Sequence, residues 1–88
     1  MKVQHAQDLG NGHSIEIGAA TWDPSDRSVR NRYQTASGGF SPHSSSEIPV
    51  DDLVPLIEFL AKHDELSIEQ CAKVINALSV SILRQAGK

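Results

Sequence analysis

The chain has 88 residues, of which 39% are hydrophobic and 22% are charged, and its formal net charge is −3 at pH 7. This length permits one domain with one modest core, and the composition is that of a folded protein rather than a disordered one. The acidic balance argues against strong non-specific binding to nucleic acid, which depends on many cationic contacts to phosphates.

The first two segments predict a turn followed by a strand. Residues 1–12 are polar and end in a glycine-asparagine-glycine turn signal, so we expect them to be loose or to form a short edge strand. Beyond them, Ile15 and Ile17 alternate with Glu16, a period of two that predicts a half-buried strand. Gly18 interrupts this alternation, and glycine inside a strand often marks a bulge.

A turn and a second strand follow. Residues 23–26 read Asp-Pro-Ser-Asp, in which aspartate can bond to its own backbone and proline presets the turn. The next segment alternates again, which places Val29 and Tyr33 on one face and Arg30 and Arg32 on the other. The two strands therefore predict a hairpin with a short loop.

The rest of the predicted sheet has weaker signals. Phe40 is positioned to open a third strand, residues 41–47 are serine-rich and irregular, and residues 48–50 predict a brief extended segment. We therefore expect a β-meander of three or four strands over residues 13–50.

Residues 51–64 predict a first helix. Asp51 or Asp52 can cap it, and Pro55 then lies in the first turn, where a missing N–H costs little. Its apolar residues follow helical spacing: Leu53, Leu56, Ile57, Leu60 and Ala61.

Residues 67–86 predict a second, longer helix. Ser67 and Gln70 match a capping box at its start, and Gly87 suits its end. Its apolar stripe consists of Ile68, Cys71, Ile75, Leu78 and Ile82.

These elements predict an α+β fold, a three- to four-stranded antiparallel meander with two C-terminal helices packed on one face. Chains this small have thin stability, and dimerisation is a common remedy. We expect a homodimer formed through the second helix, with Val74, Leu78 and Val80 as contact candidates.

No pattern for a metal or a catalytic centre is visible. Four separated histidines and one cysteine form no ligand pair of the usual spacing: His5, His13, His43, His63 and Cys71. The serines at residues 44–46 and the paired aspartates at residues 51–52 are explained by a bend and a helix start. We therefore expect no metal, no cofactor and no enzymatic activity.

A basic strand is the strongest candidate for binding. Arg30 and Arg32 share one face about 6.5–7 Å apart, so they could contact successive phosphates or carboxylates. Arg27 extends this positive area, and Tyr33, Trp22 and Phe40 could stack on bases. The alternative is that the arginines lie on the solvent side of a two-layer sheet while the aromatic side chains fill its core.

Part of the chain resembles the positive transcriptional coactivator family of single-stranded-DNA-binding proteins. The matching residues lie within 29–60: Val29, Arg30, Arg32, Tyr33, Gly39, Phe40, Pro42, Ile48, Val50, Leu53 and Leu56. This resemblance implies a curved antiparallel sheet crossed by a helix, dimerisation through that helix, and backbone contacts to single-stranded DNA from Arg30 and Arg32. The chain departs from the family where residues 44–47 replace a lysine-rich segment, and residues 67–85 have no counterpart.

The leading functional hypothesis is a non-enzymatic module that binds a protein partner. A small acidic chain would suit a regulator or inhibitor, by analogy with accessory proteins of phages and mobile elements. The alternative is binding of single-stranded nucleic acid through the basic strand. We expect a cytoplasmic protein, because Cys71 has no partner for a disulfide and the sequence has neither a signal peptide nor a membrane-spanning run.

Overall fold

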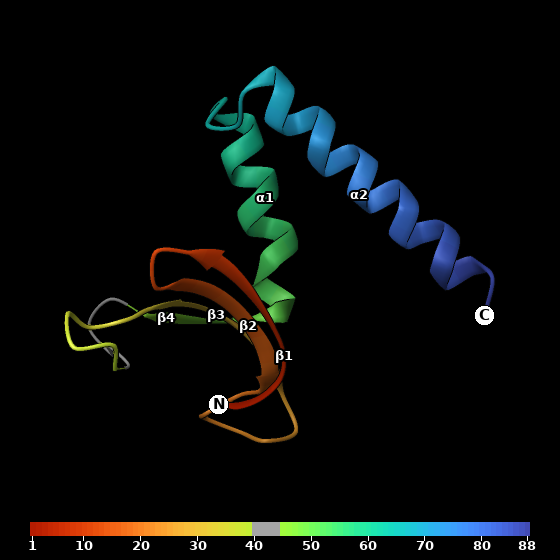
Figure 1. Cartoon of the computed structure of the whole chain (residues 1–88). Coiled ribbons are helices and arrows are strands. Elements are labelled where there is room, and N and C mark those ends of the chain that lie inside the picture. The colour runs from red at the N-terminus through yellow and green to blue at the C-terminus, as the bar shows by residue number, and fades with distance from the viewer. Residues whose placement is uncertain (40–44) are drawn as a thin grey trace. The chain divides into compact units, whose positions relative to one another are not determined.

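The computed structural model describes residues 1–39 and 45–88 and contains four strands followed by two helices (Figure 1). The strands lie in the order β1-β2-β3-β4, and each is antiparallel to its neighbours. This arrangement confirms the predicted α+β class. The elements are β1 (Lys2–Gly10), β2 (His13–Ala19), β3 (Arg27–Tyr33), β4 (Ser46–Pro49), the 3₁₀ turn η1 (Val50–Asp52), α1 (Leu53–Lys62) and α2 (Ile68–Ala86).

The chain divides into two compact units, which we call the sheet unit (Met1–Val54) and the helical unit (Pro55–Lys88). The four strands and η1 belong to the sheet unit, and nearly all of α1 and the whole of α2 belong to the helical unit. The expected packing of the helices on one face of the sheet stays a prediction.

The predicted hairpin is formed by β2 and β3. Their register pairs Glu16 with Arg30 and Ile17 with Val29. In the connecting turn, the Asp23 carboxylate accepts hydrogen bonds from the backbone N–H and the hydroxyl of Ser25, at 2.9 and 2.8 Å. These two bonds hold the pKa of the Asp23 carboxyl below its usual value. The turn is therefore fixed by local aspartate chemistry, as its sequence predicts.

The N-terminal segment forms a nine-residue edge strand, β1, where a loose segment or a short strand is expected from the sequence. A bulge lies between Val3 and His5, opposite Gly18 of β2. A Cβ atom on Gly18 would lie 1.9 Å from the Lys2 carbonyl oxygen, so only glycine allows this close approach. The bulge predicted near Gly18 is present, and its extra residue belongs to β1.

One face of the sheet unit buries polar side chains. Glu16 and Ser28 are both buried, whereas Ala20 is the buried hydrophobic residue of the described part of the chain. Alternation along β3 places Arg30 on the same face as Ser28 and opposite Val29, as predicted. The expected solvent exposure of the arginines is wrong for Arg30, whose side chain is 15% exposed.

The start of α1 differs from its prediction. Pro49 precedes η1 as the N-cap and provides no side-chain cap, so Asp51 and Asp52 lie within the 3₁₀ turn instead of capping the helix. The helix ends at Lys62. Beyond it, Asp64 adopts a positive φ of 54°, and the N–H of Glu65 donates to the Leu60 carbonyl at 3.0 Å. This arrangement satisfies the last carbonyl groups of the helix.

The start of α2 confirms its prediction. The Ser67 hydroxyl accepts from the backbone N–H of Gln70 at 3.1 Å, and the Gln70 side chain accepts from the N–H of Ser67 at 2.9 Å. Gly87 occupies the C-cap position. The nineteen-residue helix is therefore delimited at both ends by the signals in its sequence.

Candidate functional site

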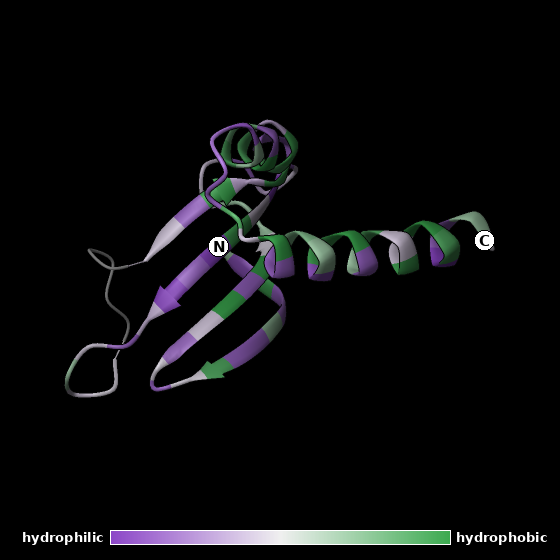
Figure 2. Cartoon of the chain, turned by 90° about the horizontal axis from the view of Figure 1, so that it is seen from above, coloured by the Kyte–Doolittle hydropathy of each residue, from purple (hydrophilic) through white to green (hydrophobic). Residues whose placement is uncertain are grey.

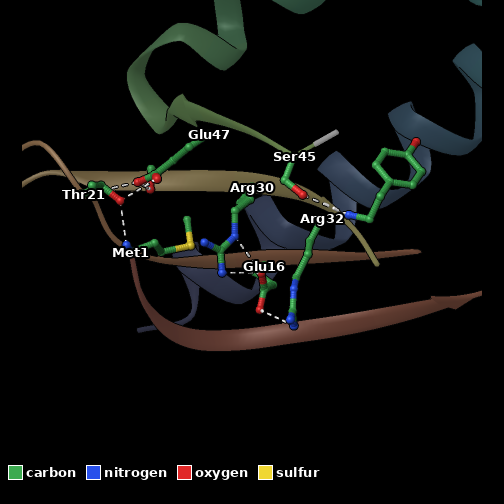
Figure 3. A network of polar contacts seen from close by, with 9 residues as sticks. Met1, Glu16, Thr21, Arg30, Arg32, Ser45 and Glu47 are labelled. Carbon is green, nitrogen blue, oxygen red and sulfur yellow. Dashed lines mark hydrogen bonds and ion pairs between the residues drawn. The ribbon is translucent and has the colours of Figure 1, made fainter. Parts of the chain in front are cut away.

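A polar cluster on the sheet unit brings together two of the predicted binding residues with an acidic partner (Figure 3). Arg30 reaches Glu16 with its Nε and Nη2 atoms, which lie 2.8 and 2.7 Å from Glu16 Oε1. Arg32 approaches the other carboxylate oxygen at 3.9 Å. The Glu16 side chain is 7% exposed, and that of Arg32 is 35% exposed. The negative charge of Glu16 therefore offsets part of the positive charge of Arg30 and Arg32 on β3.

A second acidic residue joins the loop after β2 to β4. The Glu47 carboxylate accepts hydrogen bonds from the N–H and hydroxyl of Thr21 and from the Ser28 hydroxyl, at 2.7–2.8 Å. Partial burial acts to raise the pKa of this carboxyl, but these bonds and the nearby charge of the Met1 amino group together lower it. Glu47 therefore stabilises the join as a carboxylate.

Two further candidates lie at the end of the sheet where β3 begins. Arg27 donates to the Gln4 side chain at 2.6 Å, and alternation along β3 places it on the face opposite Arg30. The Trp22 ring N–H donates to Asp26 at 3.0 Å. Both residues line a cavity of about 350 Å³ that is open to solvent. Arg27 therefore does not extend the face of Arg30 and Arg32, contrary to its predicted role.

Tyr33 forms a stacked pair with a histidine of the neighbouring strand. Its ring lies 4.2 Å from that of His13, with an angle of 5° between the planes. His13 Nε2 is hydrogen-bonded to the Asn31 side chain. One face of the Tyr33 ring therefore packs against His13, on the side of the sheet opposite Arg30. The remaining aromatic candidate, Phe40, lies outside the described residues.

The helical unit presents a different kind of surface. Large apolar side chains recur along α2 (Figure 2) and many are exposed to solvent, including Ile68 at 92%. We call this set, together with the exposed apolar residues of α1 in the same unit, the apolar helix surface. It comprises Leu56, Ile57, Phe59, Ile68, Ile75, Leu78, Val80, Ile82 and Leu83. Within the described chain these helices contain no buried residue.

The three predicted dimer candidates lie at different places around α2. Leu78 and Val80 are exposed members of the apolar helix surface. Val74 is half-buried. Successive helical residues are rotated by about 100°, so Val80 projects away from the side that carries Ile68, Ile75 and Leu78.

Sequence reasoning does not identify the two acidic partners in the sheet unit. Glu16 reads only as the outward residue of an alternating strand, and Glu47 as part of an irregular segment. Opposite charges often pair across antiparallel strands. A search for the hairpin register that sets Glu16 opposite Arg30 could therefore have identified this pair.

Other site chemistry is limited in the described residues. Residues 1–39 and 45–88 contain no group of three or more histidine, cysteine, aspartate or glutamate side chains placed to hold a metal ion. In the same ranges no helix combines the length and the apolar character that crossing a membrane requires. Cys71 is a free thiol and is half-buried.

Comparison of the chain with protein-family models, with curated proteins and with solved structures found no match. The physical features of the two units therefore carry the functional argument.

Proposed function

We propose that the chain is a non-enzymatic interaction module that binds a protein through the apolar helix surface. The exposure of large apolar side chains along α2 is the observation that carries this proposal. Contiguous apolar patches on folded proteins mark interaction sites more often than chance, whereas single exposed apolar residues need no explanation. On α2 the exposed residues Ile68, Ile75, Leu78 and Ile82 recur at spacings of seven, three and four positions, so they share one side of the helix and form a patch.

The energy available from this surface is sufficient for specific binding. Burial of one large aliphatic side chain contributes about 1.5–3 kcal/mol. Ile68, Ile75 and Ile82 are each more than 60% exposed, and Leu78 is about half exposed. Their burial would contribute roughly 4–8 kcal/mol from this chain alone, before the partner's contribution and the cost of association. The role of a regulator or inhibitor remains part of this proposal.

Binding measurements with matched variants test the proposal. The full chain would be used to capture proteins, and each recovered protein would then be purified and titrated by calorimetry. Leu78→Lys should weaken binding at least tenfold, because the new charge must be buried at an apolar contact. Asn76→Lys adds the same charge at an exposed polar position of α2 and should change the affinity little. Equal affinity for both variants would contradict the proposal.

Binding of single-stranded nucleic acid is the alternative, and the contacts of the basic strand support it less well. Arg30 is mostly buried against Glu16, and Arg32 shares the same carboxylate. If the alternative holds, affinity for a labelled oligonucleotide should fall steeply with salt, and Arg32→Ala should reduce that slope. Arg27→Ala, on the opposite face, serves as the control. On the protein-binding proposal, the oligonucleotide should not bind at physiological salt.

A further inference from the structure

We propose that the partner of α2 is α2 of a second copy of this chain, paired antiparallel. The contact would run along five residues that we call the α2 seam: Ile68, Cys71, Ile75, Leu78 and Ile82. This inference rests on the proposed function, because it names one partner for the same surface.

The spacing of the α2 seam is that of a coiled coil. Its residues are separated alternately by three and four positions, which gives a mean repeat of 3.5 residues. Helices with this repeat pack side by side, because the apolar line stays on one side of each helix as the two wind together.

The seam is available for such a contact. Ile68 and Ile75 are 92% and 63% exposed, and Leu78 and Ile82 are also more than half exposed. Cys71 is half-buried, and its sulfur lies 3.7 Å from the Leu66 carbonyl oxygen.

The residues beside the seam permit close approach. Ala72, Ser79 and Ala86 follow it on one side, and Val74 and Ser81 follow it on the other. None is charged, and all are small or β-branched. A second helix could therefore approach the seam without desolvating a charge.

The charged residues of α2 lie away from the seam. They are Glu69, Lys73 and Arg84, and helical rotation places each of them more than 90° from the centre of the seam. Glu69 and Lys73 approach each other at 3.8 Å on that outer side. The separation of charge from the seam is what a helix with one buried side requires.

The symmetry of the seam permits an antiparallel pair that stays in register along its whole length. Its spacing reads the same from both ends when Gln85 is added as the next position. A two-fold axis between Asn76 and Ala77 would set Ile75 against the partner's Leu78 and Cys71 against the partner's Ile82. One surface would therefore match itself, as the interface of a symmetric dimer must.

Charge favours the same direction. Glu69 lies in the first turn of α2 and Arg84 in the last turn. Antiparallel pairing opposes the two helix dipoles, and it sets the end that carries Glu69 beside the partner's end that carries Arg84, an attraction between outer surfaces that salt screens. Parallel pairing would bring like charges together at both ends.

Sedimentation equilibrium of the full chain tests the pairing. The wild-type protein should change from dimer to monomer on dilution. Ile75→Lys should raise the dissociation constant roughly a hundredfold, because a charge would enter the apolar contact. Ala77→Lys places the same charge at an exposed alanine on the opposite side of α2, outside the apolar helix surface, and its dissociation constant should stay within about threefold of the wild-type value.

Thiol oxidation tests the direction. In an antiparallel pair the two Cys71 side chains are about 16 Å apart along the axis, since each residue advances the helix by about 1.5 Å. Mild oxidation should then leave the wild-type dimer uncrosslinked. In Ile82→Cys, each new thiol would lie opposite the partner's Cys71, and a covalent dimer should form readily. Rapid crosslinking of the wild-type protein through Cys71 would indicate parallel pairing and overturn the proposal.

The outcomes separate this inference from the proposed function. A monomer at the highest concentration would overturn self-pairing, and the proposed function would survive if another purified protein lost affinity for Leu78→Lys. A monomer with no such protein would overturn both. A monomer that Ile75→Lys unfolds and Ala77→Lys does not would show that the seam packs within one chain, which also overturns self-pairing.

Discussion

The sheet unit and the helical unit treat their side chains in opposite ways. In the sheet unit a carboxylate is buried and paired with an arginine, and further hydrogen bonds join β4 to the loop after β2. In the helical unit the local backbone signals are satisfied at both ends of α2, yet apolar side chains along it are exposed. Specific polar pairing holds the first unit together, while the second unit has well-formed helices and an apolar surface open to solvent.

This difference suggests a division of roles in which polar pairs stabilise the sheet unit and exposed apolar residues of the helical unit bind a partner. A change that breaks a polar pair in the sheet unit should unfold it, because a buried charge without its partner is costly. A change of an exposed group in the helical unit should affect stability little and binding strongly. The four predictions below test this division, beginning with the largest expected effect on stability.

Loss of the Glu16 charge should have the largest effect. Glu16→Gln keeps the size of the side chain but removes the carboxylate charge that lies 2.7 Å from the Arg30 guanidinium group, and we expect the free energy of unfolding to fall by about 3 kcal/mol. Urea denaturation followed by circular dichroism would measure it.

Glu69→Gln is the matched control in the helical unit. Glu69 and Lys73 form an exposed pair one helical turn apart, and such pairs contribute about 0.5 kcal/mol or less. If the two substitutions cost the same, the Glu16 pair is no more important than a surface pair and the comparison fails.

The bulge opposite Gly18 should give the next largest effect. Gly18→Ala would force the new methyl group against the Lys2 carbonyl, so part of β1 must move, at a cost of about 2 kcal/mol. Hydrogen exchange of the β1 amides should become faster. Gly87→Ala adds a methyl group that stays 3.5 Å or more from its neighbours and should change stability by less than about 0.5 kcal/mol. Unchanged exchange in β1 would contradict the close approach.

Local chemistry was predictable from the sequence, and long-range pairing was not. The Asp23 turn and the Ser67 capping box each depend on residues within three positions, so their sequences predict them directly. The assignment of Asp51 or Asp52 as a cap was wrong because Pro49 takes the N-cap position and η1 precedes the helix. Pro49, Asp51 and Asp52 are all residues that commonly occur at helix starts, and residue propensity alone does not determine at which of them the helix begins.

The candidate site shows the same limit. The sequence predicts that Arg30 and Arg32 share a face, since alternation along one strand fixes this. It does not predict that Glu16, fourteen positions before Arg30, forms an ion pair with the Arg30 guanidinium group. The register between β2 and β3 determines this pairing. The sequence allows residues 1–12 to be loose or to form a short edge strand, and it does not predict the full nine-residue length of β1. Its residues are mostly polar, and pairing with β2 determines its conformation.

Removal of the α2 cap should have a smaller effect, confined to the helical unit. Ser67→Ala removes the acceptor for the Gln70 N–H, at a cost of about 1 kcal/mol to the helix. Hydrogen exchange should accelerate in the first turn of α2 and stay unchanged in the strands. Ser79→Ala, the same substitution within the helix, should be neutral or slightly stabilising. Acceleration in the strands as well would show that the two units unfold together.

The smallest effect should come from Glu47 and should depend on pH. The pKa of its carboxyl is lower in the folded chain than the ordinary value of 4.5, so folding favours the carboxylate. Its contribution is therefore complete above the unfolded pKa and is lost as pH falls through the folded pKa. Glu47→Gln should cost less than about 1 kcal/mol at pH 7. The difference from wild type should shrink as the pH falls below 4.5 and through the lower pKa of the folded chain.

Glu58→Gln, at an exposed position of α1, removes the same charge from the helical unit and provides the control for the pH series. Thermal unfolding at several pH values would compare the two variants. A Glu47→Gln difference that stays constant with pH would mean that the hydrogen bonds of Thr21 and Ser28 do not depend on the carboxylate charge. The join between the loop and β4 would then owe its stability to packing and to neutral hydrogen bonds rather than to the charge of Glu47.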